Sequence, residues 1–372
     1  MRVKTHLTLV CLLTLISLAE AMELKTDFLG NFEVNGALTG YFLSGKRVAE
    51  EAKKNRIDVS SSILGITNTG NKTLPFEFTL VGGAYAMPTI GIDTAKTADY
   101  VDIFSPLPIV FMEVEPVKSF RISIGRMGTL IGYEAPFTYQ NNYIQRGLVW
   151  NMQPFFHHGL RFSYIGELYQ LKVGINDGYY SLGVDSYTQC GRALRRLAYA
   201  LEGAIGFTPL KDLNVTFNFL IPEKDARPNE VALPANKRQY NLVTNYNFRN
   251  FTFGTDLLYV YAPSSTKAQV TDSAKAYGFA LHFTYDYSPF RFSLRAEYVK
   301  DKKDKGALDL VGIGENNQGF TLTFTPGYYR DPLLIRAEVS YIKAQKDFAD
   351  IKRGVPNSDF QTRFGLEWGF RF

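Results

Sequence analysis

The feature that most constrains the fold is an alternation of apolar and polar residues with a period of two, which recurs through the chain beyond residue 21. In segment 290–299, phenylalanine, leucine, alanine and tyrosine alternate with arginine, serine and glutamate. Successive side chains of a β-strand point to opposite faces, so such a segment gives a strand with one apolar and one polar face. Helical periodicity is nearly absent. The sequence therefore predicts an all-β fold.

The first 21 residues differ from the rest and have the form of a removable export signal. Arg2 and Lys4 precede a short apolar stretch from Leu7 to Leu18, and Ala19-Glu20-Ala21 is a small-x-small cleavage site. We therefore expect residues 1–21 to be cleaved and residues 22–372 to form the mature protein.

About sixteen segments have the strand pattern. The two weakest are 57–67 and 109–115, where the alternation is poor or short. The other predicted strands are 31–43, 75–85, 120–127, 159–166, 169–176, 195–207, 213–221, 238–248, 251–262, 274–287, 290–299, 317–327, 333–343 and 361–372.

The connections decide whether the apolar faces pack inward, as in a soluble sandwich, or face lipid, as in a membrane barrel. Connections of 11–31 residues alternate strictly with connections of 2–7 residues. Long external loops and short periplasmic turns are typical of bacterial outer-membrane barrels. The pattern predicts a transmembrane, antiparallel, up-and-down β-barrel in a Gram-negative-type outer membrane, with both chain ends on the short-turn side.

Aromatic residues cluster beside the short connections. Phe248 and Phe251 flank one predicted turn, and Tyr287 and Phe290 flank another. Aromatic rings prefer the boundary between hydrocarbon and water, so this placement indicates a girdle at the membrane surface. The high strand propensity of aromatic residues accounts for their number but not for their clustering at turns.

The last predicted strand, 361–372, has apolar residues at every second position and ends on phenylalanine. Trp368, Phe370 and Phe372 look like the C-terminal targeting signal that the barrel-assembly machinery reads. Because lipid offers no hydrogen-bond partners, the first and last strands of a membrane sheet must pair. We expect Gly30 to Leu43 to lie beside the last strand and close the barrel.

A barrel of sixteen strands encloses an aqueous channel unless something plugs it. The longest connection, 128–158, contains many apolar residues and would be the third external loop. Such a loop lowers its free energy by packing against another surface. We expect it to fold toward the lumen and narrow the channel; a cap over the mouth and a contact with a neighbouring barrel are the alternatives.

The same region resembles a known family, the OmpL-like porins, also called the β-barrel porin-2 family. The resemblance depends on Gly125-Arg126, Gly132-Tyr133-Glu134, Asn141-Asn142, Arg146, Pro154 and His158-Gly159-x-Arg161. Gln145 departs from the family pattern, which has a small hydroxyl residue before the arginine. The resemblance implies passive diffusion of small hydrophilic solutes or ions across the outer membrane, and it allows a homotrimer without requiring one.

Charged residues of the loop and of the inward strand faces are the candidates for a pore constriction. Glu134 and Arg146 are the pair expected at the narrowest point, although both could instead pin the loop to the wall. The wall candidates are Arg121, Arg161, Glu113, Glu115, Arg291, Arg295 and Arg336. Acids and bases could face each other across the channel and create a transverse field. Alternatively they form ordinary salt bridges, such as Arg295 with Glu297.

Other functions have little support in the sequence. No Gly-x-Ser-x-Gly motif is present, the segment 312–319 reads as a polar loop rather than a phosphate cradle, and we expect neither catalysis nor a cofactor. His157 and His158 would point to opposite faces of a strand, which disfavours a metal site. The mild net charge of +5 disfavours nucleic-acid binding. The alternatives to a diffusion porin are an adhesion or binding barrel with a blocked lumen and a substrate-selective channel.

Overall fold

The computed structural model describes residues 22–26, 30–46, 55–68, 76–90, 97–178, 199–226, 234–303, 308–346 and 359–372. The predicted export signal, residues 1–21, lies outside these described residues. Among the residues that are described, no helix is long and apolar enough to cross a membrane.

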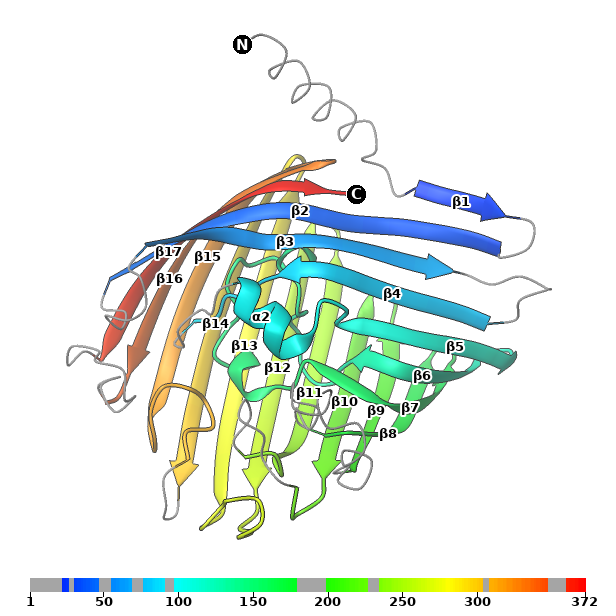
Figure 1. The fold of residues 1–372 in the computed structure, drawn as a ribbon. Helices are drawn as coiled ribbons and strands as arrows, with labels where there is room; N and C mark the ends of the chain where they lie inside the picture. The colour runs from blue at the N-terminus through cyan, green and yellow to red at the C-terminus, as the bar shows by residue number, and fades with distance from the viewer. Residues whose placement is uncertain are drawn as a thin grey trace.

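The main structure is a closed, antiparallel β-barrel of sixteen strands, in which each strand pairs with its neighbours in the sequence (Figure 1). The strands are β2 (Gly30–Lys46), β3 (Asn55–Asn68), β4 (Phe76–Tyr85), β5 (Ile109–Val117), β6 (Phe120–Gly128), β7 (Phe156–Ile165), β8 (Tyr169–Asn176), β9 (Ala200–Leu210), β10 (Leu213–Pro222), β11 (Arg238–Phe248), β12 (Phe251–Ala262), β13 (Ala274–Tyr287), β14 (Phe290–Lys303), β15 (Gln318–Arg330), β16 (Leu333–Ala344) and β17 (Phe360–Arg371).

The predicted all-β barrel is confirmed, including the strands expected at 57–67 and 109–115. Four further elements were not expected from the sequence. They are strand β1 (Met22–Thr26), helix α2 (Thr97–Phe104) and the short 3-10 helices η1 (Thr138–Gln140) and η2 (Trp150–Met152). All four are short, and three of them lie in connections that lack periodicity.

The outer face of the barrel wall carries apolar side chains and the inner face carries polar ones. On β14, the side chains of Phe292 and Tyr298 face outward and are 37% and 43% exposed. Ser293, Arg295 and Glu297 alternate with them, face inward and are buried. An apolar outer face opposite a polar inner face is typical of a transmembrane barrel, so the outer face of the wall is the membrane-contacting face.

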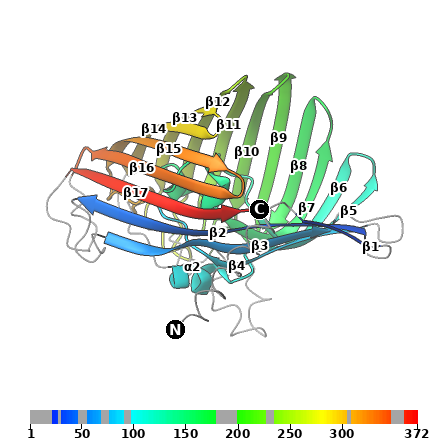
Figure 2. The same cartoon turned by 90° about the horizontal axis from the view of Figure 1, so that it is seen from above.

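The barrel closes between its last strand and β2, as expected (Figure 2). The paired residues run from Thr362 opposite Lys46 to Arg371 opposite Ala37. Beyond this seam, β1 pairs with the start of β2, where Thr26 lies opposite Gly30. Every strand of the barrel therefore has two neighbours, which satisfies the backbone hydrogen-bonding groups inside the membrane.

Candidate functional site

The long loop, residues 129–155 between β6 and β7, contacts the inward face of the barrel wall. Its backbone N–H groups donate hydrogen bonds to buried carboxylates of the strands: Ile144 to Glu338 on β16 at 2.7 Å, and Val149 to Glu297 on β14 at 3.1 Å. These bonds satisfy backbone groups that would otherwise be buried without partners. The loop is thus held against the polar inner surface of the wall.

Two buried arginines of the wall donate hydrogen bonds to backbone oxygens of the same loop. Arg336 donates hydrogen bonds to the backbone oxygens of Thr138, at 2.8 Å, and Asn141. Arg295 donates to the backbone oxygen of Gln145 at 3.0 Å. Both guanidinium groups are fully buried, so these charge-assisted bonds form away from bulk water, where they are strong.

Glu134 and Arg146, expected either at the narrowest point or as residues that pin the loop to the wall, are both buried. The Glu134 carboxylate contacts Arg295 and accepts a hydrogen bond from the Gly147 backbone at 2.8 Å. Arg146 donates to the backbone oxygens of Ala135 and Ile144 in its own loop, at 2.9 and 3.1 Å. Burial lowers the pKa of Arg146 to about 10. Glu134 therefore attaches the loop to the wall, and Arg146 holds the loop's own turns together.

A second connection, residues 86–108, is joined to the long loop. The Arg146 N–H donates to the Pro88 carbonyl at 2.7 Å, and the Ile90 N–H donates to the Arg146 carbonyl at 2.9 Å. Helix α2 of this connection contacts the long loop through the rings of Phe104 and Phe155, whose centroids are 5.4 Å apart. No periodic signal in the sequence marks residues 86–90, which explains why this junction was not predicted.

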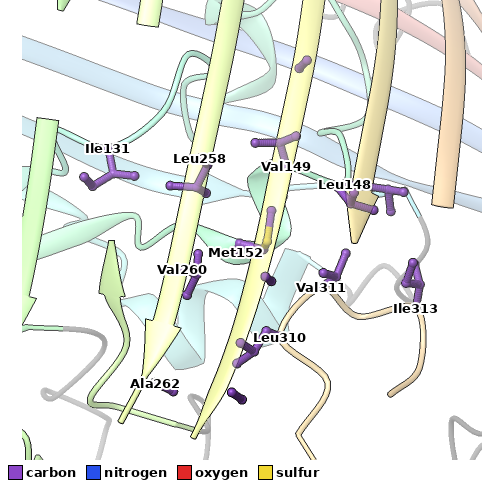
Figure 3. Close-up of a cluster of buried hydrophobic side chains, with 14 of the residues drawn as sticks. Ile131, Leu148, Val149, Met152, Leu258, Val260, Ala262, Leu310, Val311 and Ile313 are labelled. Atoms are coloured by element: carbon purple, nitrogen blue, oxygen red, sulfur yellow. The ribbon is translucent and has the colours of Figure 1, made fainter. Parts of the chain in front are cut away.

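The long loop also makes apolar contacts, in a cluster of buried hydrophobic side chains inside the barrel (Figure 3). Leu148, Val149 and Met152 of the long loop pack against Leu258 and Val260 of β12. All five side chains are buried, at 3% exposure or less. Part of the lumen is therefore filled by apolar side chains rather than by water.

The segment 308–317 contributes to this cluster, although the sequence suggested a polar loop there. Leu310, Val311 and Ile313 are buried in it. The carboxylate of Asp309 accepts hydrogen bonds from the backbone N–H groups of Val311, at 3.1 Å, and Gly314, at 2.7 Å. The Leu310 N–H donates instead to Asp301 of β14 at 3.2 Å. The backbone groups of this loop thus have partners in the loop and on the wall, while its apolar side chains pack into the cluster.

A charged part of the inner wall is only partly covered. Arg121 on β6 lies 2.9 Å from Glu113 and 3.5 Å from Glu115, both on β5. The side chains of Arg121 and Glu115 are 36% and 40% exposed. These strands thus present charges that water can reach.

The wall candidates form local ion pairs, which is the second of the two arrangements considered from the sequence. Arg295 lies 3.2 Å from Glu297 on the same strand, as that alternative specified. The other pairs are Arg161 with Glu202 at 2.7 Å, Arg291 with Asp286 at 2.5 Å and Arg336 with Glu367 at 2.5 Å. Each of these bases therefore has an acidic partner on the same or a neighbouring part of the wall.

His157 and His158 both lie near Asp177, although their nearest partners differ. The Nδ1 atom of His157 lies 2.8 Å from the Gly178 carbonyl, and that of His158 lies 3.2 Å from Asp177. Within the described ranges, no group of three or more His, Cys, Asp or Glu side chains is arranged to hold a metal ion.

A closed barrel with an apolar outer face and a polar inner face defines an integral protein of the outer membrane. The chain belongs to the family described as β-barrel porin-2, OmpL-like, whose model matches residues 31–372. This confirms the resemblance found in the sequence. The family and the fold are those of channels rather than of enzymes.

Solved porin structures have the same fold at low sequence identity. OmpT of Vibrio cholerae has a TM-score of 0.60 and 12% identity, with 94% of this chain and 100% of that chain covered. OmpF of Salmonella typhi, in complex with daunomycin, has a TM-score of 0.60 and 11% identity, with 94% and 100% covered. An anion-selective porin from Comamonas acidovorans has a TM-score of 0.57 and 10% identity, with 92% and 99% covered. No curated protein sequence matches the chain.

Proposed function

We propose that the protein is a porin through which small hydrophilic solutes diffuse passively across the outer membrane. The observation that carries this proposal is the partly exposed ion-pair group of Arg121, Glu113 and Glu115 on the inner wall. Charged side chains in a barrel interior keep this exposure only where water reaches them. The long loop contacts β3 and β4 through Thr138 and Phe137, and it contacts β11 through Met152. It would therefore narrow the channel on the side of β11 to β17 and of β3 and β4, and leave the water path along β5 to β10.

The proposal includes export and assembly. Residues 1–21 serve as a cleaved signal peptide, and residues 22–372 form the mature barrel. Trp368, Phe370 and Phe372 are the residues that the barrel-assembly machinery would recognise. Outer-membrane lipid surrounds the apolar face, and association into a homotrimer stays a prediction.

Conductance in a planar lipid bilayer tests the central claim. Protein extracted from outer membranes is added to one side of a bilayer in potassium chloride solution, and the current is recorded at constant voltage. We expect stepwise increments of similar size, one for each inserted channel. A protein that inserts but gives no steps would overturn the proposal.

The apolar cluster favours a second candidate, a barrel with a blocked lumen whose external loops bind a partner. Leu148 and Met152 are fully buried in that cluster. Replacing each by alanine removes packing that contributes about 2–5 kcal/mol in a well-packed core. If the lumen is blocked, the wild type is silent in the bilayer and L148A/M152A produces current. Leu171→Ala, on the outward face and 49% exposed, is the matched control.

A substrate-selective channel is the third candidate. Liposome swelling with a series of neutral sugars of increasing mass distinguishes it from a general porin. A general porin gives swelling rates that fall smoothly with solute size, whereas a selective channel favours one solute over a smaller one.

A further inference from the structure

A cavity of about 840 Å³ lies at the short-turn end of the barrel, beneath the long loop. One side is formed by loop residues and the other by the ends of β14, β15 and β17, close to the C-terminus marked in Figure 1. Its lining includes the side chains of Tyr139, Gln140, Asn142, Arg291, Tyr329 and Arg371. Neither the family nor the proposed diffusion of solutes assigns a role to this cavity.

Two of the lining residues are arginines that share one aromatic ring. The guanidinium carbon of Arg291 lies 4.9 Å from the ring centroid of Tyr329, and that of Arg371 lies 5.4 Å from the same centroid. The two positive groups are therefore at most about 10 Å apart, since each lies within cation–π range of one ring. Both groups also belong to the lining of the same cavity.

Each guanidinium group still has a hydrogen-bond donor to offer. Arg291 uses Nε for Asp286 and Nη1 for the side-chain oxygen of Asn142, at 3.2 Å. Arg371 uses Nε and Nη2 for Asp331, at 3.3 Å. Among the described residues, Nη2 of Arg291 and Nη1 of Arg371 have no hydrogen-bond partner. Their side chains are 30% and 34% exposed, so a ligand in the cavity can reach them.

We propose that this cavity binds a small oxyanion, either a carboxylate or a phosphate. Guanidinium groups present planar, paired donors that match the oxygens of both. The free donors of Arg291 and Arg371 would hold the anion, and the neutral amide of Gln140 adds polar surface beside them.

Each of the two arginines already has an acidic partner: Asp286 lies 2.5 Å from Arg291, and Asp331 lies 3.3 Å from Arg371. Asp286 does not line the cavity, and Asp331, which does, is 75% exposed. An anion in the cavity would therefore be held by hydrogen bonds from the two unused donors rather than by an excess of positive charge.

Isothermal titration of the full barrel in detergent micelles tests the proposal, with sodium succinate and inorganic phosphate as separate probes. We expect at least one probe to bind to the wild type, and we expect R291Q/R371Q to bind it at least about tenfold more weakly, since each lost charge-assisted hydrogen bond has this order of effect. The probe that binds identifies the anion class.

Arg330→Gln is the matched control, because Arg330 follows Tyr329 directly but is exposed and does not line the cavity. R330Q removes one positive charge at the same end of the barrel, where R291Q/R371Q removes two, and should bind as the wild type does. Equal weakening in R330Q and R291Q/R371Q, or no binding of either probe to the wild type, overturns the proposal. The test measures binding rather than conduction, so its outcome is separate from that of the bilayer experiment.

Discussion

The guanidinium Nη1 of Arg295 lies 2.5 Å from Oε1 of Glu134, which joins strand β14 to the long loop between positions 161 residues apart in the sequence. Both side chains are buried, at 0% and 6% exposure. The Arg295 guanidinium also lies 4.6 Å from the ring centroid of Tyr143 in the same loop. One wall residue therefore holds the loop through a charge, a backbone contact and an aromatic ring.

Replacing Glu134 by glutamine should loosen the long loop and lower the free energy of unfolding. Breaking a buried ion pair costs about 3–5 kcal/mol, and the loss here should fall below that because Glu297 still neutralises Arg295. Urea unfolding of the detergent-solubilised barrel measures the stability, and limited proteolysis measures the accessibility of residues 129–155.

The control for E134Q is Asp225→Asn, which breaks the exposed pair between Asp225 and Lys267. Exposed pairs contribute about 0–1 kcal/mol, so D225N should unfold close to the wild type and leave the long loop protected. If E134Q resists urea and protease as well as D225N does, the Arg295–Glu134 contact does not hold the loop.

Gly369→Ala should impair closure of the barrel. Gly369 lies on β17 with a φ of +155°, and a Cβ atom there would meet the Leu38 carbonyl oxygen of β2 at 2.1 Å. The seam between the first and last barrel strands would have to shift, since no backbone oxygen tolerates that approach. We expect a lower folded fraction, measured by the gel-mobility difference between folded and heated barrel.

Gly128→Ala is the control for this closure test. Gly128 is also a strand glycine, at the end of β6, but a Cβ atom there meets nothing within 4 Å. G128A should fold like the wild type. Equal folded fractions for G369A and G128A would mean that the seam adapts without cost.

The strands could be predicted from the sequence because their alternation records which side faces lipid. Phe292 and Tyr298 are apolar since they contact hydrocarbon, and Arg295 between them is polar since it faces the interior. The closing pair of β17 and β2 followed from the same physics, because a membrane sheet has no tolerated edge.

The contacts of the loops could not be predicted in the same way. The hydrogen bond from Ile144 to Glu338 joins positions 194 residues apart, and loops carry no periodicity that encodes such a partner. Arg146 was expected either at the narrowest point of the channel or against the barrel wall. Its actual partners are backbone carbonyls within its own loop. Because every residue has a backbone carbonyl, the residue types do not indicate which of them Arg146 will bind.

Lys237 should make the stability of the barrel depend on pH. It lies just before β11, is 5% exposed, and burial lowers its pKa from 10.5 to about 7, although Asp309 opposes the shift. Between these two values the unfolded chain binds a proton that the folded chain does not, so the free energy of unfolding should rise with pH from about 7 toward 10.5.

Lys237→Met should remove this contribution, so that the free energy of unfolding depends less on pH. Urea midpoints measured at pH values between about 7 and 10.5 test this expectation. Lys267→Met is the control, because Lys267 is 64% exposed and should leave the slope as it is in the wild type. A K237M barrel whose urea midpoint follows pH as steeply as that of the wild type would contradict the assignment.

Arg121→Ala and Arg161→Ala should affect ion selectivity differently, because the two arginines differ in exposure. Arg121 is 36% exposed, and its loss leaves Glu113 and Glu115 facing water without their base. The reversal potential in a potassium chloride gradient should therefore shift toward cation selectivity.

Arg161 is 12% exposed and pairs with the buried Glu202. Its loss should cost stability, about 3–5 kcal/mol for a broken buried pair, and leave the reversal potential unchanged. Equal shifts in both variants would show that the ions pass Arg161 as closely as Arg121, and that the water path is not confined to the partly exposed wall.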